Sequence, residues 1–145
     1  MHSTMKANKS ILITGGSGLL ALNWALNVRD KYKVTLLLHR RKISLGGVNI
    51  DYLPLNSLDD CLFALEKHQP SIVIHTAGLT NVEECESNPK LANEINVGIA
   101  KRIAMACSIM CTKLVHISPD HLFYGRHEFT SEDDEPSPIN TYGKT

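Results

Sequence analysis

Near its beginning the chain reads Ser10-Ile11-Leu12-Ile13-Thr14-Gly15-Gly16-Ser17-Gly18-Leu19-Leu20-Ala21. The apolar run predicts a strand over 10–14, the glycines predict a tight turn, and the apolar residues after them predict a helix. Backbone N–H groups of such a turn converge on one point, where the helix dipole favours negative charge. The spacing Gly16-x-Gly18-x-x-Ala21 also fits the dinucleotide-binding fingerprint, which tolerates alanine in its third position.

We therefore predict a phosphate-binding turn at the end of the first strand. Its cofactor-binding residues are Gly15, Gly16, Ser17, Gly18, Leu19 and Leu20. The alternative is an ordinary turn between a strand and a helix, as found in any α/β protein.

Similar apolar, β-branched runs alternate with helical patterns along the rest of the chain. They predict strands over 33–38, 48–53, 71–76 and 113–118, helices over 18–29, 58–68 and 89–109, and a last helix beginning near 140–142. Strands separated by helices favour a parallel sheet with helices on both faces. Right-handed crossovers then predict a Rossmann-like, doubly wound α/β fold with the strand order 3-2-1-4-5.

The bulk composition limits the possible functions. A chain of 145 residues suffices for one domain with a core, which we place at 9–145, with 1–8 as a disordered leader. Lys and Arg together number 15, as do Asp and Glu, so no net charge attracts nucleic acid or an anionic membrane. No apolar run approaches the roughly 20 residues of a transmembrane helix. No signal-peptide core follows Met1, so we expect a cytoplasmic protein.

The cysteines and acids do not predict a metal site. Cys61, Cys85, Cys107 and Cys111 lack C-x-x-C pairing and a secretory context, so we expect buried, reduced thiols. Cys107 and Cys111 are four residues apart on the predicted helix and therefore share a face. The acidic run at 132–135 belongs to a stretch that predicts an exposed, solvated loop.

In an open parallel sheet, ligands bind beyond the carboxyl ends of the strands. Where the second strand ends, His39 occupies the place in which an acid would select NAD, and Arg40 and Arg41 follow it. Because an Arg fork suits phosphate, we predict that NADP(H) is preferred over NAD(H); a solvated basic turn is the alternative. After the third strand, Asn56 and Ser57 either bracket an adenine or cap a helix, and the two roles are compatible.

The end of the fourth strand adds small residues to this edge. Thr76, Ala77 and Gly78 let the backbone approach a cofactor closely, and we include them in the cofactor site. His75, which precedes them, is more typical of a core or strand-end histidine than of a ligand.

Ser118, Asp120 and His121 follow the fifth strand and resemble the components of a hydrolytic triad. Residues so close in sequence do not generally align as nucleophile, base and orienting group, and the chain has no G-x-S-x-G elbow. We therefore reject this reading.

Taken together, these motifs resemble the extended short-chain dehydrogenase/reductase family, most closely its dTDP-4-dehydrorhamnose reductase-like members, which act on nucleotide sugars. The likeness runs from Lys9 to Thr145. It rests on Ile-Thr-Gly-Gly-Ser-Gly-Leu-Leu at 13–20, His-Thr-Ala-Gly at 75–78, Glu-Ile-Asn-Val at 94–97, Val-His-Ile-Ser-Pro-Asp-His-Leu-Phe at 115–123, and Pro-Ile-Asn-Thr-Tyr-Gly-Lys-Thr at 138–145.

The resemblance implies an NADPH-dependent reduction of a 4-keto-6-deoxy sugar nucleotide. In the family a Tyr-x-x-x-Lys pair and a Ser or Thr carry out the reaction, with the tyrosine as general acid and the lysine lowering its pKa. Tyr142 occupies the tyrosine position, whereas Pro119 occupies the Ser/Thr position. Ser118 is adjacent but would point the opposite way if the strand continued. Tyr142 and Ser118 are therefore our candidate catalytic residues.

The lysine of the Tyr-x-x-x-Lys pattern would be residue 146, directly after Thr145. Lys144 is a poor substitute, because a residue two positions after Tyr142 lies on another side of a helix. Family members are longer, with further strands and a sugar-binding region. We therefore expect an N-terminal part of a longer reductase, inactive alone, whose partner is a nucleotide sugar; a homodimer is left open. The alternatives are a non-catalytic, dinucleotide-binding regulatory or scaffold subunit and a nucleotide-sugar epimerase.

Overall fold

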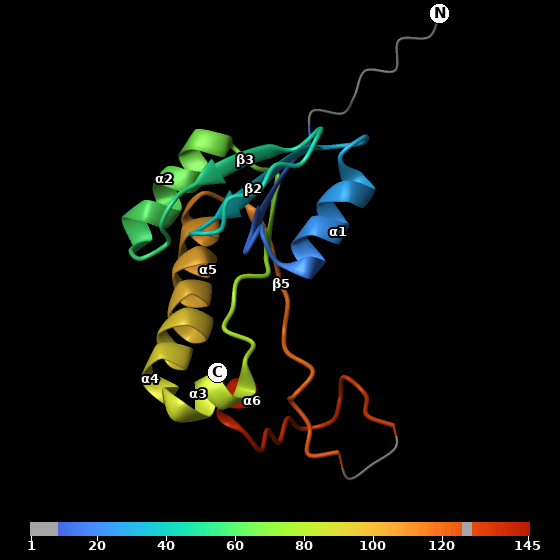
Figure 1. Ribbon diagram of the computed structural model, residues 1–145, viewed down its shortest axis with the longest axis vertical. Coiled ribbons are helices and arrows are strands. Elements are labelled where there is room, and N and C mark those ends of the chain that lie inside the picture. Colours follow the sequence, from blue (N-terminus) through green and yellow to red (C-terminus); the bar gives the residue numbers. More distant parts are fainter. Residues whose placement is uncertain (1–8, 126–128) are drawn as a thin grey trace, which may run out of the picture. The chain divides into compact units, whose positions relative to one another are not determined.

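The computed structural model describes residues 9–125 and 129–145, so the predicted leader at 1–8 lies outside the described residues. The chain forms two compact units (Figure 1). The first runs to Ala77 and resumes over Ile99–Ile117, and the second consists of Gly78–Gly98 and Ser118–Thr145. None of the helices in the described residues has the length and apolar character needed to cross a membrane.

A parallel, five-stranded sheet forms the centre of the first unit (Figure 1). Its strands are β1 (Ser10–Thr14), β2 (Lys33–Leu38), β3 (Asn49–Tyr52), β4 (Ile72–His75) and β5 (Lys113–His116). The observed order, β3-β2-β1-β4-β5, confirms the predicted doubly wound, Rossmann-like fold. Nearly every residue of β1 and β2 is buried, as expected for parallel strands that are covered on both faces.

Helices cover both faces of this sheet. They are α1 (Leu19–Val28), α2 (Leu58–His68) and α5 (Ile99–Ile109). Figure 1 shows α1 on one side of the strands and α2 and α5 on the other. Because side chains alternate between faces, Ile11 and Ile13 pack with α1, whereas Leu12 packs with α2 and α5. The core therefore encloses β1 on both faces of the sheet.

The helix predicted over 89–109 is interrupted. It consists of α4 (Pro89–Ala92), the π-helix η1 (Asn93–Gly98) and then α5. Within η1, the Oδ1 of Asn96 accepts the N–H of Leu79 at 2.7 Å, and its Nδ2 donates to the Leu79 carbonyl at 3.2 Å. Apolar periodicity does not encode such a side-chain bond, so the sequence did not predict the interruption.

The short helix α3 (Val82–Ser87), which precedes α4, was also not predicted. Asn81 caps it by accepting the N–H of Glu84 at 2.9 Å. Cys85 is its buried residue, so the segment carries no periodic apolar signal. The last helix, α6 (Thr141–Lys144), begins where the sequence predicts it.

The prediction that Cys111 is buried on the same helix face as Cys107 was wrong. Helix α5 ends at Ile109, and Cys111 is exposed with a left-handed φ of 50°. The N–H of Thr112 donates to the Cys107 carbonyl at 2.8 Å, and that of Cys111 donates to the Ser108 carbonyl at 3.2 Å. This Schellman closure ends the helix before Cys111. The other three cysteines are buried, and all four are free thiols.

Candidate functional site

The glycine turn after β1 packs directly against neighbouring backbone. Gly15 has a φ of +66°, and a Cβ built on it would lie 2.8 Å from both the Cα and the N of Ala77. Gly16 donates its N–H to the Leu37 carbonyl at 3.1 Å. A Cβ on Gly16 would lie 2.8 Å from the Cβ of Leu36. Both positions therefore require glycine, because any side chain would displace β2 or the segment after β4.

Within the described residues, the N-terminus of α1 has no side-chain cap. Its N-cap, Gly18, provides no side-chain hydrogen bond, and its first turn contains no acidic residue. Leu19 and Leu20, in that turn, are 81% and 48% exposed. The first N–H groups of a helix have no carbonyl partner within the helix, and the helix dipole attracts anions to them. The chemistry of this helix end therefore suits a phosphate group.

Helix α2 begins in the opposite way. The Oγ of Ser57 accepts the N–H of Asp60 at 3.0 Å, and Asp60 accepts the N–H of Ser57 at 3.0 Å. This capping box confirms the capping role predicted for Ser57. Asp59 and Asp60 also place negative charge in the first turn, which disfavours a phosphate there. Asn56 is exposed, with its N–H bonded to Asp60 at 3.1 Å; its contact with adenine stays a prediction.

The basic run, which consists of His39, Arg40 and Arg41, lies at the same edge of the sheet as the glycine turn. His39, Arg40 and Arg41 directly follow the end of β2, and all three are exposed. A Cβ on Gly16 would lie 3.1 Å from the Cδ1 of Leu38, the last residue of β2. The turn and the start of the basic run are therefore neighbours, which the sequence order alone did not guarantee.

A polar row crosses the carboxyl ends of three strands. Thr14 pairs with His75, and His75 pairs with His116. The Oγ1 of Thr14 and the Nδ1 of His75 are hydrogen-bonded at 2.6 Å, and the rings of His75 and His116 stack with centroids 5.4 Å apart. Thr76 donates its hydroxyl to the Thr14 carbonyl at 2.7 Å, which fastens the segment that leads to Ala77.

His75 is buried within this row. Its side chain is 1% exposed, and its Nε2 has no hydrogen-bond partner among the described residues. Burial, with a smaller contribution from His116, lowers the pKa of His75 from 6.5 to about 4. The ring is therefore neutral at physiological pH, in agreement with the core role that the sequence favoured.

Tyr142 lies in the second unit, on α6. Its ring packs edge-on against His121, with centroids 5.4 Å apart and planes at 68°. Asn140, the N-cap of α6, donates from Nδ2 to the Nδ1 of His121 at 2.8 Å. Burial first, and then the charges of Asp120 and Cys85, raise the pKa of Tyr142. The phenol is therefore protonated at neutral pH and holds a proton that it can donate.

Ser118 lies beyond the end of β5, so the prediction that this strand continues to 118 was wrong. The strand ends at His116, and the N–H of Ile117 adds one last bond to the His75 carbonyl at 3.1 Å. Pro119 has no N–H to extend the ladder. The alternation argument therefore does not apply to Ser118, which is exposed. In residues 9–125 and 129–145, no hydrogen bond joins Ser118 to Tyr142.

Two side chains that the sequence did not single out hold α6 in place. Glu86, on α3, accepts the N–H of Thr141 at 2.5 Å. Asn96 donates from Nδ2 to the Oγ1 of Thr145 at 3.0 Å. Asn96 belongs to the Glu-Ile-Asn-Val motif at 94–97, which could have identified it, whereas no sequence signal pointed to Glu86.

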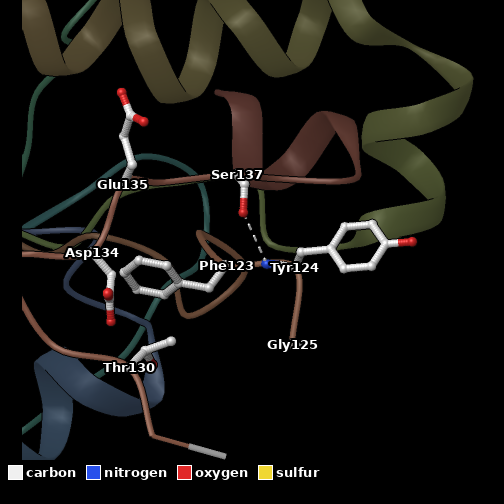
Figure 2. Close-up of a pocket in the computed structure, with 7 residues that line it drawn as sticks. All are labelled: Phe123, Tyr124, Gly125, Thr130, Asp134, Glu135 and Ser137. Carbon is white, nitrogen blue, oxygen red and sulfur yellow. Dashed lines mark hydrogen bonds between the residues drawn. The ribbon is translucent and has the colours of Figure 1, made fainter. Parts of the chain in front are cut away.

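The acidic loop of the second unit is exposed, as predicted, and it borders a pocket of about 230 Å³ (Figure 2). Its lining residues are Phe123, Tyr124, Gly125, Thr130, Asp134, Glu135 and Ser137. The Tyr124 N–H donates to the Ser137 hydroxyl at 3.3 Å, shown as a dashed line in Figure 2. With two carboxylates and no basic residue in this lining, the pocket does not suit the phosphates of a nucleotide.

The strand order defines a Rossmann-like α/β domain, and its glycine turn and uncapped helix give one edge a chemistry that suits phosphate. Residues 9–145 match the family described as "RmlD substrate binding domain", and the chain belongs to this family.

The chain is similar to proteins that are named for different functions. Methionine adenosyltransferase 2 subunit beta of Rattus norvegicus is 30% identical over 141 residues, which cover 95% of this chain and 40% of that protein. A hypothetical dTDP-4-dehydrorhamnose reductase from Sulfolobus tokodaii is 30% identical, with a TM-score of 0.84 over 93% of this chain and 48% of that chain.

The dTDP-4-dehydrorhamnose reductase of Bacillus anthracis, solved in complex with NADP, is 27% identical, with a TM-score of 0.79 over 94% of this chain and 46% of that chain. The chain thus spans less than half the length of each of these proteins.

The neutral, buried His75 makes stability depend on pH. The pKa of His75 is about 4 in the folded chain, whereas its ordinary value, which applies to the unfolded chain, is 6.5. Between these two pH values the unfolded chain therefore binds more protons than the folded chain. The folded state is therefore destabilised as pH falls from about 6.5 to about 4, by on the order of 3 kcal/mol in total. We expect urea unfolding of His75→Gln to lack this part of the pH dependence. A difference between wild type and variant that is constant over this window would contradict the assignment.

Proposed function

We propose that this chain is the dinucleotide-binding part of a nucleotide-sugar oxidoreductase that uses NADP(H). The observation that carries the proposal is the N-terminus of α1. It has a glycine N-cap, no acid in its first turn and exposed leucines, while the backbone before it is too closely packed for a side chain. A dinucleotide pyrophosphate matches this arrangement. The family of the chain and the NADP complex of the Bacillus anthracis reductase support the same assignment.

Each predicted cofactor residue has a role in this proposal. Gly15, Gly16 and Gly18 shape the turn, and the N–H groups of Ser17, Leu19 and Leu20 bind the pyrophosphate. Arg40 and Arg41, with His39 beside them, bind the additional phosphate of NADP(H). Asn56 and Ser57 border the adenine. Thr76 and Ala77 have small side chains and Gly78 has none, so that the backbone can approach the cofactor. When bound, the nicotinamide supplies a hydride to the carbonyl carbon of the sugar.

Tyr142 supplies the proton of the same reaction. Its raised pKa keeps the hydroxyl protonated, so that it can donate to the carbonyl oxygen as the ketone becomes an alcohol. Donation leaves a phenolate, which regains a proton from solvent, and a nearby cation would stabilise that phenolate and so favour donation. Lys144 is not suited to this role, because it lies two residues after Tyr142 and leaves another side of α6. In a longer protein, a lysine directly after Thr145 would complete the family's Tyr-x-x-x-Lys pair. Ser118 is the hydroxyl that we assign to assist.

The second candidate is a non-catalytic, dinucleotide-binding subunit. Pro119 favours it, because this residue has no hydroxyl where the family uses Ser or Thr. The similarity to methionine adenosyltransferase 2 subunit beta supports it as well. Lysine directly after Thr145 in the full-length sequence would favour the enzyme, and any other residue there would favour the binding subunit.

The cofactor preference predicts the behaviour of an Arg40→Ala/Arg41→Ala variant. We expect its affinity for NADPH to fall about tenfold or more, since a charge-assisted hydrogen bond contributes about 1.5–3 kcal/mol. Its affinity for NADH should change less than about twofold. Calorimetric titration measures both affinities. Lys31→Ala is the matched control, because Lys31 is exposed and lies before β2, at the other end of that strand. A wild-type chain that binds NADH as tightly as NADPH would overturn the preference.

The catalytic assignment predicts the behaviour of Tyr142→Phe in the full-length protein. With NADPH and a 4-keto-6-deoxy sugar nucleotide, we expect kcat to fall at least about 100-fold, because the general acid is lost. The affinity for NADPH should not change. Tyr52→Phe is the control, since Tyr52 is exposed on β3. A variant that keeps its rate would refute the role of Tyr142, whereas an inactive wild type that binds NADPH would favour the regulatory subunit.

A further inference from the structure

Helix α3 is joined to the first residue of α6 by a carboxylate. The Oε1 of Glu86 accepts the backbone N–H of Thr141 at 2.5 Å, and the side chain of Thr141 also helps to lower the pKa of this carboxylate. Thr141 directly precedes Tyr142 in the chain. The contact therefore fixes the backbone from which the phenol side chain extends.

The carboxylate of Glu86 is ionised over most of the pH range. The backbone N–H and the side chain of Thr141, together with the charge of Lys144, hold the pKa of Glu86 below its ordinary value. A charged acceptor at the first turn of a helix binds an N–H group that has no partner within the helix, and it interacts favourably with the helix dipole. Glu86 thus stabilises the start of α6 from outside the helix.

Such outside contacts decide where α6 lies, because a helix of four residues is not stable by itself. Asn140 accepts the N–H of Gly143 at 2.8 Å, and Asn96 binds the Thr145 hydroxyl at 3.0 Å. These bonds hold the middle and the end of the helix. Glu86 holds its beginning, next to Tyr142.

We propose that Glu86 is a positioning residue for Tyr142: it fixes the first turn of α6, so that the phenol is aimed at the substrate carbonyl. The inference rests on the proposed function, because it takes Tyr142 as the general acid. Glu86 does not itself touch the reacting atoms. A small displacement of a reacting group is enough to lower a rate strongly, so loss of this anchor should affect turnover and spare cofactor binding.

The test is a double-mutant cycle in the full-length protein, assayed with NADPH and a 4-keto-6-deoxy sugar nucleotide. We expect Glu86→Ala to lower kcat about tenfold or more, with KM and the affinity for NADPH changed less than about twofold. Glu86→Gln, whose amide oxygen still accepts the Thr141 N–H, should recover most of the rate. In a Tyr142→Phe background, Glu86→Ala should have no further effect, because the group that it positions is gone.

Each outcome separates the two hypotheses. Equal loss of rate from Glu86→Ala in the wild-type and Tyr142→Phe backgrounds would show a general structural role and overturn the inference. No loss from Glu86→Ala would overturn it as well. An unchanged rate in Tyr142→Phe alone would instead refute the proposed catalytic role. Glu83→Gln is the matched control, since Glu83 is exposed in the first turn of the same helix, and circular dichroism verifies that each variant is folded.

Discussion

The close packing of the Gly15 backbone against Ala77 is the constraint on which the cofactor edge depends. A side chain at Gly15 would meet backbone atoms at 2.8 Å, and the left-handed φ of this residue disfavours other residue types. The turn can therefore reverse the chain within a few residues and start α1 directly at the edge of the sheet. Because Gly18 is the N-cap, that helix begins without a side-chain partner. The features that suit this helix end to an anion thus result from packing rather than from any charged residue.

The rest of the edge follows from the same sheet. The parallel register places Thr14, His75 and His116 in one row, and the Thr14 hydroxyl together with the hydroxyl of Thr76 fastens β1 to β4. Helices α1 and α2 differ in how their first N–H groups are satisfied. Ser57 and its capping box satisfy the start of α2, whereas Gly18 makes no side-chain cap hydrogen bond at the start of α1.

The sequence predicted the strand order because the buried strands contain apolar runs, as in Ile11–Ile13, and because helical patterns lie between β1 and β2, between β3 and β4, and between β4 and β5. It failed where a single side chain or a helix end decides the local structure. The bond from Asn96 to Leu79 accompanies the π-helix, and a Schellman closure leaves Cys111 exposed. Glu86 was missed because its contact with α6 joins segments that are far apart in sequence. Periodicity does not report contacts of that kind.

The central claim is that the N–H groups of Ser17, Leu19 and Leu20 bind the pyrophosphate of a dinucleotide. Titration of the ¹⁵N-labelled protein with NADPH, followed by amide NMR, tests it most directly. The account predicts that the amides of Ser17, Leu19 and Leu20 shift in proportion to occupancy, and that Gly15→Val abolishes these shifts. Saturable binding that leaves these amides unchanged, or binding that survives in Gly15→Val, would contradict it.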